Sequence, residues 1–156
     1  MQGYKFLLAS IFLGVLTACV SPDEQVRTIS LDGKWMSKYP ARFEFDIEDA
    51  QNPKNIIFVI RNNDDYPYMN LRLKATVSRI NEKGKVADVL NYMLAEPNGL
   101  WTGTGFGATK ETLGRYKVNY KFPANGKYKI EIRHLMNRSP LVGLEDIGIK
   151  IETVKP

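Results

Sequence analysis

Hydrophobic and polar residues alternate along most of this chain. Between Arg42 and Glu48, Phe43, Phe45 and Ile47 fall on one side and charged or polar residues on the other. Strict alternation of this kind is typical of a strand with one buried face. The same pattern recurs at 71–78, 116–122, 128–134 and 147–151. These segments are therefore predicted to be half-buried strands.

Three further segments need separate interpretation. Residues 56–60 are all β-branched or aromatic, which predicts the most buried strand. Residues 86–94 fit either a helical stripe or a strand, and the hairpin-type turn before them favours a strand. Residues 100–107 place glycine at every second position from Gly103, which favours an extended strand with one bare face.

The elements together predict an all-β fold. About eight short strands, separated by turn signals roughly every dozen residues, are typical of a single antiparallel β-sandwich, with a barrel as the alternative. No long helix is predicted after the N-terminal segment.

The N-terminal segment has the order of a secretory signal. Lys5 precedes the apolar stretch 6–15, which is too short to span a membrane, and small residues follow it. Leu16–Cys19 resembles the lipobox of bacterial lipoproteins, in which the cysteine is acylated after cleavage before it. We therefore expect Cys19 to be the lipid attachment site and the contact with the membrane. The alternative is an ordinary cleaved signal with an incidental cysteine.

These features divide the chain into three parts. Residues 1–18 are predicted to be a lipoprotein signal peptide, 19–34 an acylated cysteine with a flexible tether, and 35–156 the β-sandwich domain. The tether is assigned because it is polar, with an acidic pair directly after the anchor.

Charge and cysteine content exclude several classes of protein. The formal net charge is +5, and removal of the signal with Lys5 leaves +4, spread along the strands. That distribution and a secreted location argue against nucleic acid as a partner. Cys19 is the only cysteine, so no disulfide and no thiolate metal site is expected.

No group of residues predicts catalysis or a cofactor. His134 is the only histidine and follows the apolar phase of its strand, so a packed histidine is expected. The oxygen-rich residues Asn62, Asn63, Asp64, Asp65 and Asn70 could bind calcium, but they lack its loop spacing and also favour turns. The adjacent acids Glu145 and Asp146 point to opposite faces of a strand. We predict no enzyme, no metal and no cofactor.

Aromatic residues near turns are the best candidates for contact with a partner or ligand. They are Trp35, Tyr39, Tyr66, Tyr68, Trp101 and Phe106. Core packing is the commoner role of such rings, and Tyr66 and Tyr68, beside a very polar turn, are the expected exceptions. An alternative function, a glycan-binding surface lipoprotein, predicts that Tyr66, Tyr68 or Trp101 are exposed and coplanar.

Several motifs together resemble the gliding-motility-associated lipoprotein H family of the Bacteroidetes. They are the lipobox at Cys19 and the segments 61–63, 66–71, 99–105, 126–128 and 141–148. One departure is Asn137, where an arginine is expected after Met136.

The resemblance implies an envelope lipoprotein required for surface gliding and the linked type IX secretion machinery, with no catalytic residues. A scaffold or stabiliser of other envelope lipoproteins or secretion-system proteins fits this role. Val20 after Cys19 favours the outer membrane, by analogy with retention rules.

Overall fold

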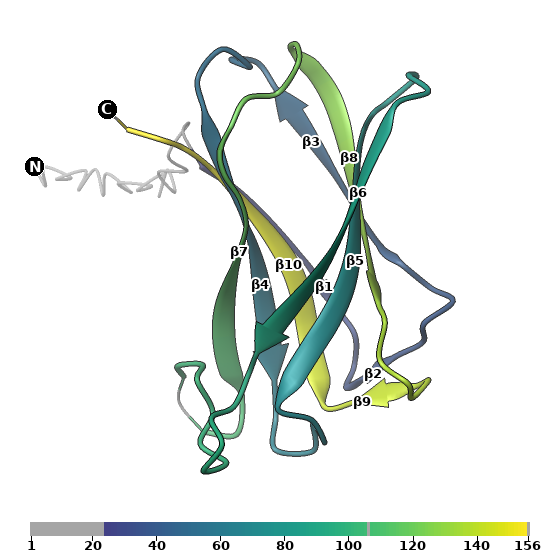
Figure 1. The fold of residues 1–156 in the computed structure, drawn as a ribbon, viewed down its shortest axis with the longest axis vertical. Coiled ribbons are helices and arrows are strands. Elements are labelled where there is room, and N and C mark those ends of the chain that lie inside the picture. The colour runs from purple at the N-terminus through teal and green to yellow at the C-terminus, as the bar shows by residue number, and fades with distance from the viewer. Residues whose placement is uncertain (1–23, 106, 156) are drawn as a thin grey trace, which may run out of the picture.

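The protein is an antiparallel β-sandwich. The computed structural model describes residues 24–105 and 107–155, and these form two four-stranded sheets that face each other (Figure 1). One sheet has the order β1-β10-β4-β7, and the other has the order β3-β8-β5-β6. A short pair, β2–β9, lies at one end. The strands are β1 (Glu24–Ser30), β2 (Lys34–Trp35), β3 (Ala41–Ile47), β4 (Lys54–Asn62), β5 (Asn70–Arg79), β6 (Lys85–Met93), β7 (Lys110–Tyr120), β8 (Gly126–His134), β9 (Leu141–Val142) and β10 (Leu144–Thr153).

The core lies between the two sheets and follows the predicted alternation. In β3 every second residue is buried, and Phe45 and Ile47 are each only 2% exposed. Phe58 of β4, in the other sheet, belongs to the same core and is completely buried. Because strand side chains alternate between faces, each sheet hides one face and leaves charged residues on the other. The predicted all-β sandwich is confirmed, and the assignment of residues 86–94 to a strand is also confirmed by β6.

The prediction of a flexible tether is wrong from Glu24 onward. Residues 24–30 form β1, which pairs along its whole length with β10, from Glu24 opposite Glu152 to Ser30 opposite Asp146. An edge strand is stabilised by main-chain hydrogen bonds to one neighbour, so it needs little apolar side-chain area. The sandwich thus begins before Trp35. Cys19 and the predicted signal peptide 1–18 lie outside the described residues.

The glycine-rich segment after Leu100 is a loop, not the predicted strand. Trp101 and Thr104 form only isolated bridges, to Ala95 and Glu111. Gly105 has a φ of +152°, and its Cα lies so close to the carbonyl of Thr109 that a Cβ would overlap it. This conformation turns the chain back on itself, and β7 begins at Lys110, earlier than predicted.

Side chains close both long sides of the sandwich, where the edge strands of the two sheets meet. On one side, Asp88 of β6 accepts hydrogen bonds from the Tyr116 hydroxyl and the Lys117 ammonium of β7, both at 2.8 Å. The Lys117 contact, helped by Tyr116, lowers the pKa of Asp88. On the other side, Gln25 Nε2 of β1 donates to the main-chain oxygen of Asp46 in β3 at 2.8 Å.

His134 is packed, as predicted, at the end of β8. Its ring is 1% exposed and meets Trp35 edge-on, with centroids 5.3 Å apart. Nε2 lies 3.1 Å from the Trp35 main-chain oxygen, which can only accept, so Nε2 carries the proton. Nδ1 is buried and has no hydrogen-bond partner among the described residues. Burial lowers the pKa of His134 below 6.5, against the opposing hydrogen bond to Trp35.

We expect this histidine to make the protein less stable as the pH falls. Below pH 6.5 the unfolded chain binds a proton that the folded chain excludes, so the free energy of unfolding decreases, by at most about 1.4 kcal/mol per pH unit. Above pH 6.5 its contribution is constant. Urea unfolding between pH 7 and pH 5.5 measures this slope. The His134→Gln variant, which can keep the hydrogen bond to Trp35, should have a smaller slope, and an unchanged slope would contradict the assignment.

Candidate functional site

The candidate site is the end of the sandwich opposite the start of β1, which we call the loop end. Glu24 pairs near the finish of β10 and Ser30 near its beginning, so the chain start lies far from residues that precede β10. Asn62 pairs with both Leu144 and Lys110, and Asn70 pairs with Met93. The connections 63–69, 94–109 and 135–143 therefore meet at the loop end, at the bottom of Figure 1.

Two of these connections are bound tightly to each other. The Met69 main-chain oxygen accepts hydrogen bonds from the amides of Leu94 and Ala95, at 2.7 and 3.0 Å. Farther along, Trp101 Nε1 donates to Asp64 Oδ1 at 2.9 Å, which joins the loop after β6 to the turn after β4. This hydrogen bond places Trp101 and the Tyr66–Tyr68 segment in one region of the fold. The sequence analysis named these three aromatic residues as candidates for contact with a partner or ligand.

Tyr66 is not one of the exposed rings that the sequence analysis expected. It is only 3% exposed, its hydroxyl donates to the Asn70 main-chain oxygen at 2.8 Å, and burial raises its pKa. Tyr68 is half-buried and meets Tyr66 at 70° between ring planes, and Trp101 is also half-buried. The expectation that exposed, coplanar rings form a glycan platform is thus not met for Tyr66 and Tyr68.

The burial of Tyr66 depends on a close approach by a distant segment. Gly143, with a φ of +80°, packs its Cα directly against the main chain of Tyr66, where no Cβ would fit. The main chains are also bonded, because the Asn63 amide donates to the Gly143 oxygen at 2.9 Å. Asn63 Nδ2 donates in addition to the Glu145 carboxylate. These long-range contacts fix the turn between β4 and β5.

The oxygen-rich residues at this turn act as turn formers. Asn63 Oδ1 accepts a hydrogen bond from the Asp65 amide at 2.9 Å, and Asp64 binds Trp101. No group of three or more histidine, cysteine or carboxylate side chains suited to a metal ion occurs in the part of the chain that the structure describes. Of these oxygen-bearing side chains, Asn63 and Asp64 accept hydrogen bonds from protein donors, whereas Asn62 Oδ1 is buried without a partner among the described residues.

Exposed apolar side chains at the loop end were missed by the sequence analysis. Leu100 is 65% exposed and directly precedes Trp101 in the chain. Met69 is 40% exposed, and its main-chain oxygen accepts a hydrogen bond from the amide of Ala95, the residue that forms a bridge with Trp101. Met69, Leu100 and Trp101 together are called the loop-end patch. Leu100 directly follows the turn residues Pro97, Asn98 and Gly99. A large apolar residue next to such a turn is a signal in the sequence of an exposed apolar side chain. None of the three side chains of the patch is titratable.

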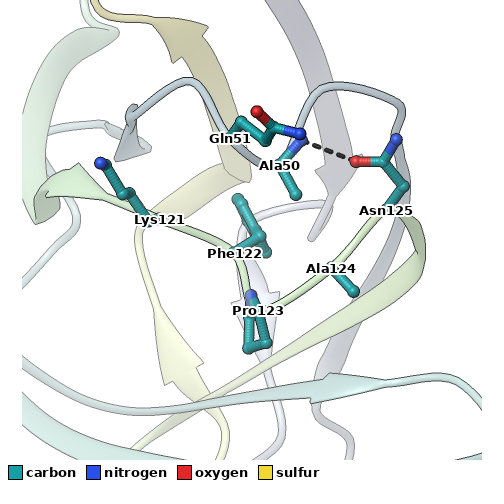
Figure 2. Close-up of a pocket in the computed structure, with 7 residues that line it drawn as sticks. All are labelled: Ala50, Gln51, Lys121, Phe122, Pro123, Ala124 and Asn125. Carbon is teal, nitrogen blue, oxygen red and sulfur yellow. Dashed lines mark hydrogen bonds between the residues drawn. The ribbon is translucent and has the colours of Figure 1, made fainter.

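A hollow at the opposite end does not provide a better site. It is lined by Ala50, Gln51, Lys121, Phe122, Pro123, Ala124 and Asn125 (Figure 2). Asn125 holds its two turns together, since Oδ1 accepts from the Ala50 amide at 2.8 Å and Nδ2 donates to the Glu48 oxygen. Only one titratable side chain, Lys121, lines it. The hollow therefore lacks converging polar groups that would fix a ligand.

We expect the Asp64 carboxylate to order the loop that carries Leu100. In Asp64→Ala, the indole of Trp101 loses its acceptor, a loss of about 1–2 kcal/mol of local stability. Amide hydrogen exchange in 94–105 should accelerate several-fold, while exchange in the sheets stays unchanged. Asp65→Ala is the matched control, since Asp65 contributes its amide, not its side chain, to the turn. Equal acceleration in both variants would contradict this role.

Residues 24–105 and 107–155 contain no helix that is long and apolar enough to cross a membrane.

Comparison with known proteins identifies a family for the chain. The GldH lipoprotein family matches residues 24–151. A gliding motility lipoprotein GldH homolog of Christiangramia forsetii is 36% identical over 126 residues, which is 76% of this chain and 77% of the relative. The gliding motility lipoprotein GldH of Flavobacterium johnsoniae is 32% identical over 130 residues, 79% and 80% of the two chains.

A solved structure, that of infectious bursal disease virus Gx strain, matches with 17% identity, covering 84% of this chain and 32% of the viral chain. Its TM-score of 0.34 is too low to bear on function. The two curated relatives and the family match are all described as GldH lipoproteins, and the family match extends from the start of β1 into β10. The chain belongs to the GldH lipoprotein family.

Proposed function

We propose that this chain is a non-enzymatic envelope lipoprotein that stabilises partner proteins of the gliding or type IX secretion machinery. Family membership indicates a membrane-anchored lipoprotein of gliding motility. The observation that carries the scaffold role is the position of the loop-end patch at the end of the domain farthest from Glu24, where the strand that follows the anchor begins. An anchored domain with its apolar contact surface held away from the membrane can bind a neighbour.

The anchor geometry supports this arrangement. Only four residues lie between Cys19 and Glu24, where β1 begins, so the two are five residue steps apart. An extended chain of that length spans at most about 18 Å. Acyl chains on Cys19 therefore hold the Glu24 end of the sandwich close to the bilayer. The loop end lies roughly the length of β10 farther out, about 33 Å at 3.3 Å per residue. Val20, the residue after Cys19, favours the outer membrane as the one that holds the anchor.

The decisive experiment compares the natural chain with Cys19→Ala in cells that glide. We expect the natural chain in the membrane fraction, and crosslinking followed by mass spectrometry should recover gliding or secretion lipoproteins. Cys19→Ala should lose the membrane fraction, those crosslinks and gliding. Ser21→Ala, two residues beyond the anchor, is the matched control and should behave like the natural chain.

A second variant separates the anchor from the scaffold role. Leu100→Glu places a charge in the exposed loop-end patch and leaves Cys19 intact, so it should stay in the membrane fraction but lose at least tenfold in crosslinked partner. Recovery of no partner by the natural chain, or of the same partners by Leu100→Glu, would overturn the proposed use of the loop end.

A further inference from the structure

The outer face of the sheet β3-β8-β5-β6 has two very different edges. On the β3 edge, the outward residues Arg42, Glu44 and Asp46 are all charged. Charged side chains along an edge strand are a common protection against unwanted pairing. On the β6 edge, the outward residues are Lys85, Ala87, Val89, Asn91 and Met93, and Lys85, at the start of the strand, is the only charged one. Val89 is 60% exposed and Met93 is 50% exposed.

Three cations lie beside this apolar edge. The register places Arg133 of β8 directly opposite Lys74 of β5, and Lys74 directly opposite Val89 of β6. Arg72 is two positions along β5 and is opposite Asn91, next to Met93. Residues paired in this way share one face, and like charges directly opposite each other destabilise a sheet. We call Arg72, Lys74, Arg133, Val89, Asn91 and Met93 the β6 face.

Among the described residues, only one of these three cations, Arg133, has a carboxylate of the protein within 4 Å. The nearest one to Arg133 is Glu131, at 3.9 Å, and that carboxylate is already paired with Arg42 at 2.9 Å. Neither Arg72 nor Lys74 has an ion pair within 4 Å among residues 24–105 and 107–155. By contrast, Lys127 and Lys129, on the other half of β8, are opposite Asp46 and Glu44. Lys127 and Lys129 form no ion pair within 4 Å in these ranges either, but each has a carboxylate opposite it in the register. On β5 and β8, the outward cations with no carboxylate opposite them therefore lie in the half of the sheet near the loop end.

We propose that the β6 face docks a partner protein whose surface presents carboxylates beside apolar side chains. The carboxylates would neutralise Arg72, Lys74 and Arg133, and the apolar groups would cover Val89 and Met93. Complementary charge of this kind gives an interface its register and selects the partner.

Anionic lipid headgroups share the charge of such a partner but fit the position less well. The β6 face lies toward the end where β5 begins and β8 finishes, whereas β1 starts at the other end. With the proposed anchor at Cys19, this face is held away from the bilayer. The preference for a protein over a lipid therefore rests on the proposed function, because it assumes the anchor at Cys19.

Site-specific photocrosslinking in cells tests the proposal with the acylated full chain. A benzophenone amino acid at position 89 should give an adduct with one protein, and the crosslinked peptide should contain aspartate or glutamate near apolar residues. The same probe at position 44, on the charged β3 edge of the same sheet, is the matched control. We expect at least ten times more adduct at 89 than at 44.

Charge reversal then tests the role of the cations. The triple variant Arg72→Glu, Lys74→Glu and Arg133→Glu, with the probe at 89, should lose at least tenfold in adduct. Charge reversal of Lys127 and Lys129 should leave the adduct unchanged. Circular dichroism checks that both variants fold, and a milder variant, Lys74→Gln with Arg133→Gln, should lose adduct by a smaller factor if the triple variant does not fold.

Each other outcome overturns the proposal. An absent adduct, equal adducts at 89 and 44, or an adduct that persists after charge reversal means that the β6 face docks no acidic protein. Binding of the natural chain, but not the triple variant, to vesicles of phosphatidylglycerol, without a protein adduct, assigns the face to a membrane. Because membrane fractionation of Cys19→Ala is scored separately, a failure here is distinguishable from a failure of the anchored-lipoprotein function.

Discussion

Replacing Phe58 by alanine is expected to lower the free energy of unfolding by about 4 kcal/mol, the middle of the range for a buried phenylalanine. The side chain is completely buried at the centre of β4. Its ring stacks on Tyr116, with centroids 4.9 Å apart, and meets Tyr92 edge-on at 5.8 Å. The loss therefore combines apolar burial, a cavity and two aromatic contacts.

Phe58→Ala should also have a local effect on the β6–β7 side of the sandwich, in addition to the lower free energy of unfolding. Tyr92 and Tyr116 belong to β6 and β7, the two edge strands that are joined by the Asp88 contacts. Without Phe58 both rings lose their support, so hydrogen exchange along this side should rise more than on the β1–β3 side. Urea unfolding of the chain from Ser21 onward, followed by tryptophan fluorescence, measures the global loss.

Val118→Ala is the control for Phe58→Ala. Val118 lies on β7 but is 55% exposed, so its truncation should change the free energy of unfolding by no more than about 0.5 kcal/mol. A loss below about 1.5 kcal/mol for Phe58→Ala would mean that the core does not centre on this ring.

Replacing Gly143 by alanine is expected to lower the free energy of unfolding by about 3 kcal/mol. Two effects add. The φ of +80° is strained for any residue with a Cβ, which costs about 1–2 kcal/mol. The new Cβ would also overlap the main chain of Tyr66 and Asp65, and relief of such overpacking costs about 1–3 kcal/mol.

Gly33 provides a matched control for this variant. It has a similar φ of +72°, and its oxygen accepts a hydrogen bond from the Gly143 amide at 3.0 Å. A Cβ on Gly33 would meet nothing within 4 Å. Gly33→Ala should therefore show only the backbone strain, about 1–2 kcal/mol. Equal losses in the two unfolding curves would show that the approach to Tyr66 contributes nothing.

Residue alternation was sufficient to predict most of this fold. Strands such as β3 and β8 bury every second residue, so their sequence carries the pattern that their structure requires. β1 was not predicted because it is an edge strand held by main-chain pairing with its neighbour. Its residues do not alternate between buried and exposed, so the sequence has no period-two pattern there. β2 and β9, of two residues each, are too short for any periodicity.

The site was harder to predict because its contacts are long-range. Tyr66 beside a polar turn has the local signals of an exposed ring, and only the approach of Gly143, far along the chain, buries it. The β6 face was missed for a related reason. Arg72, Lys74 and Arg133 are unremarkable charges on separate strands until the register places Arg133 opposite Lys74. Sequence predicts which face of a strand is polar, but pairing decides which charges become neighbours.

The pairing of β1 with β10 has a mechanical consequence for a lipoprotein of a motility system. In the proposed arrangement, force from a partner at the loop end reaches the membrane through β1, pulled along its own axis from Glu24. Hydrogen bonds in an antiparallel ladder are perpendicular to the strands, so such a pull shears them together instead of peeling them one after another. All seven residue pairs from Glu24 to Ser30 share the tension. The domain can therefore bear a pull through its lipid anchor while β1 stays paired with β10.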